Sequence, residues 1–177
     1  TGEVPSFVHE TLLVDHLAER WDGADAPHVR SVFLDKLPLY RAARGATFVH
    51  ELHEEIADGA DPGPDALDER HRDLLTAFKA PVDLGEHAGA GWQEIDLARE
   101  PYHAYLYATG SVGALSLVRA LKEGDLTAEA YREMLARGRS VRSNEAFQPT
   151  LEFTDEATVD GGIDAYADRV AGLRDAL

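Results

Sequence analysis

The sequence of 177 residues contains no cysteine, and this absence removes two kinds of site. Disulfide bonds and thiolate zinc sites both depend on cysteine. The chain also lacks an apolar run of the roughly 18–20 residues that a membrane-spanning helix needs, and it opens with no leader of basic and then apolar residues. We therefore expect a soluble, cytoplasmic protein that does not act at a membrane.

Lysine is scarce as well, since only Lys36, Lys79 and Lys122 are lysines among 17 basic residues. Asp and Glu number 33, which leaves a formal net charge of −16. A field of this sign repels phosphate backbones, so we expect no nucleic-acid partner. An acidic, lysine-poor surface repels itself at ordinary salt but is screened at high salt, which indicates a halophilic source.

Apolar residues recur at helical spacing along nearly the whole chain, with no convincing strand pattern. The pattern predicts an all-α fold that forms a single helical unit over residues 1–177. Ser6, Asp65 and Thr127 are placed to cap helices, and Pro38 and Gly45 to interrupt one. The other segments that we expect are an apolar stripe from Phe7 through Leu13 to Trp21, a loop at 58–65, an irregular connection at 80–100, and helices at about 102–121 and 163–173.

One segment carries a recognisable motif. Residues 95–125 read IDLAREPYHAYLYATGSVGALSLVRALKEGD, in which Tyr105, Tyr107 and Gly110 form a Tyr-x-Tyr-Ala-Thr-Gly pattern. Together with MLARGRS at 134–140, FVHELHEEI at 48–56 and IDAYADRVAGL at 163–173, it resembles the C-terminal part of the catalytic region of oligoendopeptidase F, in the thimet-oligopeptidase family of zinc metallopeptidases. The resemblance implies a helical bundle-like piece of a larger, zincin-type peptidase domain.

The opening stretch EVPSFVHE fits the same family. In that family an HExxH helix supplies two zinc-binding histidines and the general base, and a Glu-x-x-Ser-x-x-x-Glu segment about two dozen residues later supplies the third ligand. The resemblance therefore implies that Glu3 is a zinc ligand and that Glu10 supports the site. A second acid can hydrogen-bond a metal-binding histidine and fix its tautomer.

Two departures from the family pattern matter. HExxH is absent, because HELHE at 50–54 has its second histidine one residue early. Asp96 and Leu97 stand where the family has a Pro-His pair. The polar groups that follow, Tyr102, His103 and Tyr105, lie where the family places tyrosines that stabilise the oxyanion, so the resemblance implies that they contact the substrate.

Simpler explanations stay open for these residues. Glu3 can be a solvated charge at a helix N-terminus, Glu10 a solvated charge, and the tyrosines core residues. His9 and His16 are expected to be structural. Two other metal sites are conceivable, one from His50, His53 and Glu54, and a di-iron site from Glu100–His103 and Asp68–His71.

The reading that the sequence favours is the C-terminal helical part of a zinc metalloendopeptidase acting on short peptides. Its partners would be the peptide and the missing N-terminal half of the peptidase. With an incomplete zinc site, this chain alone is expected to be inactive. Self-association is a further expectation, through an apolar patch of Phe7, Leu13 and the tyrosine-bearing helix at about 102–121, called the tyrosine helix below. The alternative is a non-catalytic helical domain, derived from the peptidase fold, that binds a peptide or partner.

Overall fold

The computed structural model describes residues 2–79, 83–95, 100, 102–138, 140–148, 151–152 and 155–177. These residues form an all-α structure with no strand among them, as the sequence predicts. Asp96 and Leu97, the departures from the family's Pro-His pair, lie outside the described residues. Within the described ranges, no helix combines the length and the apolar character of a membrane span.

The chain divides into two compact units. The first contains residues 1–38 and 109–177, and the second contains residues 39–108. The prediction of a single helical unit over residues 1–177 stays a prediction, and each unit is described by itself below.

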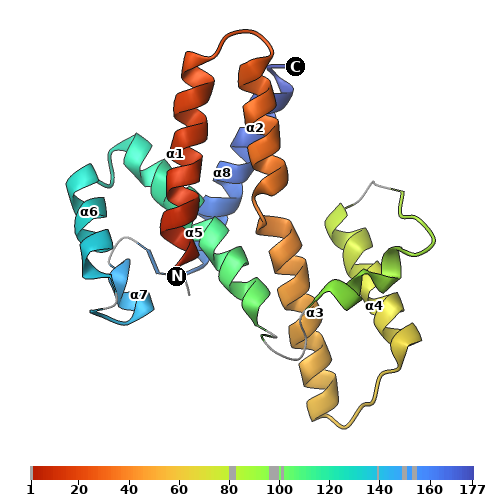
Figure 1. Cartoon of the computed structure of the whole chain (residues 1–177). Helices are drawn as coiled ribbons and strands as arrows, with labels where there is room; N and C mark the ends of the chain where they lie inside the picture. The colour runs from red at the N-terminus through yellow and green to blue at the C-terminus, as the bar shows by residue number, and fades with distance from the viewer. Residues whose placement is uncertain are drawn as a thin grey trace. The chain divides into compact units, whose positions relative to one another are not determined.

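The first unit joins helices from both ends of the chain (Figure 1). Helix α1 (Glu3–Arg20) packs against α2 (Asp25–Lys36), and α2 contacts α8 (Glu156–Arg174). Residues 109–123 of α5 (His103–Glu123) belong to this unit, followed by α6 (Ala128–Arg137) and α7 (Ser143–Ala146). Residues 110–115 of α5 are all buried, so this part of the helix lies in the core of the first unit.

The second unit is built from α3 (Leu39–Ala57), α4 (Pro64–Lys79) and the 3₁₀ helix η1 (Ala88–Glu94), with residues 103–108 of α5. Helix α4 packs against both α3 and η1. Its core consists of the buried side chains of Phe48, Leu52 and Leu67, against which Leu74, Trp92 and Ile95 pack. The indole Nε1–H of Trp92 donates to Asp68 Oδ1 at 2.6 Å, which fixes η1 on α4.

The predicted helix ends are confirmed in part. Thr127 caps α6, since its Oγ1 accepts from the backbone N–H of Ala130 at 3.1 Å. Ser6 and Asp65 were expected to be caps, and both expectations are wrong. Ser6 lies inside α1, and Asp65 is the second residue of α4. The reason is proline: Pro5 and Pro64 sit in the first turns of these helices, where a missing N–H costs no hydrogen bond.

The expected interruption of the second helical pattern occurs at Pro38, between α2 and α3. Gly45 does not interrupt it. That glycine lies inside α3 and is buried, and a Cβ atom there would meet the Cβ of Ala104 at 3.4 Å. Gly45 is therefore a site of close packing between two helices of the second unit.

The buried face of α1 differs from the predicted stripe. Its buried residues are Val4, Phe7, Val8, Thr11, Val14 and Ala18. Leu13 and Trp21, which the stripe included, are 56% and 44% exposed, while Phe7, expected in an exposed patch, is only 7% exposed. The predicted exposed patch is wrong at Phe7, because Phe7 lies on the same buried face of α1 as Val4 and Val8.

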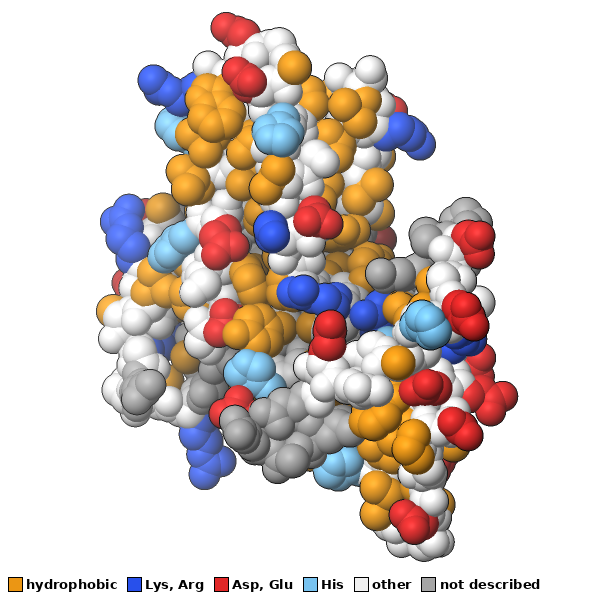
Figure 2. Space-filling model, turned by 45° about the vertical axis from the view of Figure 1, so that its right-hand side comes forward, with side chains coloured by type: hydrophobic (Ala, Val, Ile, Leu, Met, Phe, Trp, Pro, Cys, Tyr) orange, Lys and Arg blue, Asp and Glu red, His pale blue; other side chains and the backbone are white. Residues whose placement is uncertain are grey.

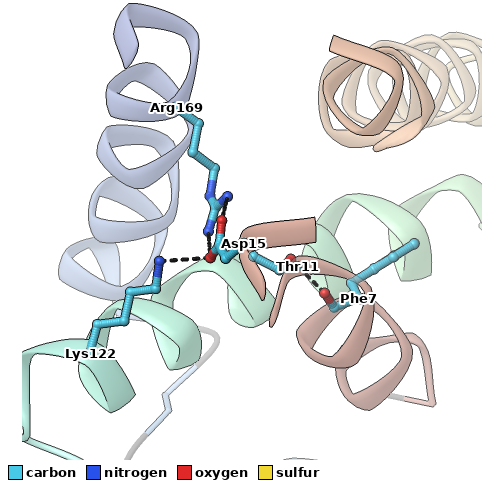
Figure 3. Close-up of polar contacts among 5 residues, drawn as sticks. All are labelled: Phe7, Thr11, Asp15, Lys122 and Arg169. Atoms are coloured by element: carbon cyan, nitrogen blue, oxygen red, sulfur yellow. Dashed lines mark hydrogen bonds and ion pairs between the residues drawn. The ribbon is translucent and has the colours of Figure 1, made fainter. Parts of the chain in front are cut away.

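Three helices of the first unit meet at an ion cluster around Asp15 (Figure 3). Arg169 of α8 donates from both terminal nitrogens to the two carboxylate oxygens of Asp15, each at 2.7 Å. Lys122 Nζ of α5 lies 2.7 Å from Asp15 Oδ2, and the guanidinium of Arg169 stacks over the ring of Phe33 in α2 at 5.8 Å. Asp15 and Arg169 are only 16% and 18% exposed, so water screens this pair weakly.

Asp15→Asn should therefore destabilise the chain. Removing one charge of a mostly buried pair leaves its partners uncompensated, and we expect a loss of roughly 2–4 kcal/mol in the free energy of unfolding, measured by urea denaturation. The matched control is Glu129→Gln. Its pair with Arg132 is 76% and 68% exposed and should contribute little. Equal losses in the two variants would contradict this role of Asp15.

The same cluster predicts a pH dependence. Burial raises the pKa of Asp15, but the hydrogen bonds and charges of Arg169 and Lys122 outweigh burial and hold it below its ordinary value of 3.8. A lowered pKa in the folded state contributes stability that is complete above the ordinary value and is lost as the pH falls through the folded value. The stability difference between wild type and Asp15→Asn should therefore shrink below about pH 4. A constant difference would contradict the cluster.

Phe48→Ala tests the core of the second unit. The ring of Phe48 is fully buried, so its removal should cost roughly 3–5 kcal/mol in the free energy of unfolding. Ile56→Ala, in the same helix but at a side chain that is 53% exposed, should cost much less. Thermal unfolding followed by circular dichroism measures both changes.

Candidate functional site

The predicted zinc ligand, Glu3, begins α1 and is half-buried. It follows directly on Gly2, and its neighbour Val4 is fully buried, so the first turn of the helix is anchored beside the carboxylate. In the described part of the chain, the Glu3 carboxylate makes neither an ion pair nor a hydrogen bond. A half-buried carboxylate without a protein partner has oxygen lone pairs left for a metal or a donor.

Glu3 lies close to the motif that carries the resemblance. Gly110, the last residue of the Tyr-x-Tyr-Ala-Thr-Gly pattern, packs against Glu3 and the ring of Phe7. Glu3 and Gly110 are 107 positions apart in the chain, yet both belong to the first unit. The opening stretch and the end of the motif therefore form one contact.

Glu10, expected to support the site, lies on α1 two helical turns after Glu3, or about 10 Å along the axis. It is exposed. Its neighbour His9 packs edge-on against Tyr131, with ring centroids 5.9 Å apart, and His9 Nε2 lies 3.4 Å from the Tyr131 hydroxyl. Burial raises the pKa of that hydroxyl. His9 therefore has the structural contact that the sequence analysis expected of it.

The predicted substrate-contacting residues begin the tyrosine helix in the second unit. Tyr102 and Tyr105 are 53% and 54% exposed, and the side chain of His103 is 48% exposed. The alternative explanation, that these tyrosines simply fill the core, is therefore wrong for Tyr102 and Tyr105. Aromatic side chains held at the surface with polar tips are suited to contacting a ligand.

His103 is held from two sides. Its Nδ1 lies 2.7 Å from Glu100 Oε2, and its ring packs edge-on against Tyr107 with centroids 5.0 Å apart. A carboxylate at Nδ1 fixes the proton on that nitrogen and leaves Nε2 as the free position of the neutral ring. From the sequence, the spacing of Glu100 and His103 suggested only half of a di-iron site. In the structure the Glu100 carboxylate instead orients the ring of His103.

His53 also contacts this region, although the sequence suggested it only as part of a metal site with His50 and Glu54. Its ring lies 5.5 Å from that of Tyr102, which brings α3 to the start of α5. No local pattern could have shown this contact, because the pairing of the two helices is not encoded in either segment alone. His50, beside it on α3, instead pairs with Glu54 at 3.6 Å on the surface.

The other metal sites that the sequence left open find no support. Asp68 accepts from Trp92, and buried His71 donates from Nδ1 to the carbonyl of Ala88 at 3.2 Å, so both have structural roles. Among the described residues, no group of three or more His, Asp or Glu could hold a metal ion. These residues fit one position of a zinc site, at Glu3, and do not form a complete site.

Comparison with known proteins agrees with the resemblance. The chain is 24% identical, over 179 residues, to an oligoendopeptidase F homolog of Borreliella burgdorferi. This chain is distantly similar to part of an oligoendopeptidase F. The alignment covers 98% of the chain but only 30% of that relative's length. No family model and no solved structure matches the chain.

The similarity confirms the resemblance seen in the sequence. The roles of Glu3, Glu10, Tyr102, His103 and Tyr105 remain predictions. Glu3 and Glu10 belong to the first compact unit, and the other three residues belong to the second.

Glu3→Gln should leave the folded chain as stable as the wild type, within about 0.5 kcal/mol. The reason is that its carboxylate makes no ion pair or hydrogen bond among the described residues, unlike that of Asp15. Urea denaturation of the two variants side by side measures the contrast. A loss as large as that of Asp15→Asn would show that Glu3 has a structural role.

Proposed function

We propose that this chain is the C-terminal helical part of a zinc metalloendopeptidase of the oligoendopeptidase F type. The observation that carries the proposal is the similarity over 98% of the chain to a part of an oligoendopeptidase F homolog. The half-buried carboxylate of Glu3, at the position that the family motif requires, has no ion-pair or hydrogen-bond partner among the described residues, which supports the proposal.

In this proposal Glu3 provides one zinc ligand, and an HExxH segment outside this chain provides two histidines and the general base. Zinc, when bound, polarises the scissile carbonyl and activates water. Glu10 hydrogen-bonds one of those histidines. Tyr102 and Tyr105 donate hydrogen bonds to the peptide, and Nε2 of His103 accepts one from a peptide N–H, because Glu100 holds the ring proton on Nδ1. The substrate class is short peptides.

The chain by itself should bind zinc poorly and hydrolyse nothing, because the residues described here supply a single ligand. Pure chain, incubated with zinc and internally quenched peptides, measures this directly. Zinc-dependent cleavage by the pure chain would overturn the division of the site that we propose.

The coding sequence upstream of Thr1 provides the first test. An in-frame HExxH about two dozen residues before Glu3 is expected. In the protein encoded by the whole reading frame, Glu3→Gln should lower bound zinc and peptide cleavage together, both measured on the same preparation. Glu19→Gln is the matched control, since Glu19 is an exposed glutamate of the same helix.

The alternative function, a non-catalytic helical domain that binds a peptide or partner, is favoured by the absence of HExxH and by Leu97 in place of a histidine. It predicts no upstream HExxH and unchanged zinc content in Glu3→Gln. Either result would remove the peptidase proposal for this protein.

A further inference from the structure

The contact between Gly110 and Glu3 is closer than any residue with a side chain would allow. A Cβ atom at position 110 would lie 2.8 Å from the Cβ of Glu3, and 3.4 and 3.5 Å from two ring carbons of Phe7. Carbon atoms at van der Waals contact are about 3.5–4.0 Å apart. Glycine at 110 therefore lets the backbone of α5 approach the first turn of α1 directly.

Neither helix has room to move away around this point. On α5, Ser111, Ala114 and Leu115 are at most 1% exposed, and on α1, Val4 and Val8 are fully buried. One turn further along α1 the packing is equally tight: Thr11 is fully buried, and its Oγ1 donates within the helix to the Phe7 carbonyl at 2.6 Å (Figure 3). Closely packed interiors transmit a displacement and do not absorb it. A larger residue at 110 would therefore push on Glu3.

We infer that Gly110 is a positioning residue that sets where the Glu3 carboxylate lies by allowing α5 to support the first turn of α1. This inference rests on the proposed function, in which Glu3 binds zinc. It gives the glycine of the Tyr-x-Tyr-Ala-Thr-Gly motif a role of its own. In this inference the motif ends in glycine because its last residue packs directly against the first turn of α1, the helix that carries Glu3.

The expected effect follows from the tolerance of metal sites. Ligand distances in such sites are held within about 0.2 Å, and a Cβ at 110 would shift Glu3 by more than that. Residues that orient a ligand typically change metal affinity by about 10–100-fold when they are replaced. We expect Gly110→Ala to weaken zinc binding within that range.

The experiment uses the protein encoded by the whole reading frame and measures zinc affinity by competition with a chromogenic chelator. Four variants are compared with the wild type: Glu3→Gln, Gly110→Ala, Gly89→Ala and Gly172→Ala. Gly89, in the second unit, is the steric control, because a Cβ there would lie 2.6 Å from the carbonyl oxygen of Asp68, while Gly172 faces open space. Thermal unfolding of each variant is recorded alongside.

We expect Gly89→Ala to lower the melting temperature but leave zinc affinity unchanged, Gly172→Ala to lower neither, and Gly110→Ala to weaken zinc binding. If Glu3→Gln weakens zinc and Gly110→Ala does not, the positioning role is overturned and the proposed function stands. If Glu3→Gln leaves zinc affinity unchanged, the ligand assignment itself fails. Equal weakening of zinc binding by Gly110→Ala and Gly89→Ala would reduce Gly110 to a general packing residue.

A double variant tests the contact without any metal. Glu3→Gly removes the Cβ atom that an alanine at 110 would strike. Gly110→Ala should therefore lower the melting temperature of the 177-residue chain less in the Glu3→Gly background than in the wild type. An equal drop in the two backgrounds would show that the two positions do not press on each other, and the inference would be withdrawn.

Discussion

The first unit depends on a charge arrangement that the chain's composition makes unusual. Acidic residues outnumber basic ones almost two to one, and the surface carries them over its visible face (Figure 2). At Asp15 two cations share one carboxylate: the Asp15–Arg169 pair is mostly buried, while Lys122 is 52% exposed. A chain that repels itself elsewhere is thus drawn together at the point where α1, α5 and α8 meet. The bidentate pairing also fixes the rotation of α8 against α1.

The ends of helices could be predicted from local sequence where the chemistry of a single residue determines them. Thr127 and Pro38 act through their own covalent chemistry, a hydroxyl acceptor and a ring without an N–H, so their effects could be read directly. The predictions for Ser6 and Asp65 were wrong because α1 begins at Glu3 and α4 at Pro64, with a proline in the first turn of each helix. The packing face of α1 could not be read correctly, because large apolar residues such as Leu13 face outward and small β-branched ones face inward. Which face is buried depends on the partner helix.

In the candidate site, too, some features could be predicted from local sequence and others could not. Glu3, Glu10 and the tyrosine motif could be recognised from spacing, because a family motif is a local pattern. The contact of Gly110 with Glu3 and that of His53 with Tyr102 could not, because each joins segments far apart in the chain. The Glu100–His103 pair lies between these cases. Its spacing was visible, but its meaning depended on finding the two side chains 2.7 Å apart on the surface.

The division of the chain has a consequence for the order in which it folds during synthesis. Residues 39–108 are contiguous, so the second unit is complete before the ribosome has made α6. The first unit is interrupted by it and closes only through pairs such as Asp15 and Arg169, which are 154 positions apart. Contacts of such separation form late, because a long loop must close before they form. Until α8 emerges, Asp15 lacks Arg169 and α2 lacks its contacts with the last helix, and incompletely packed chains of this kind are prone to aggregate.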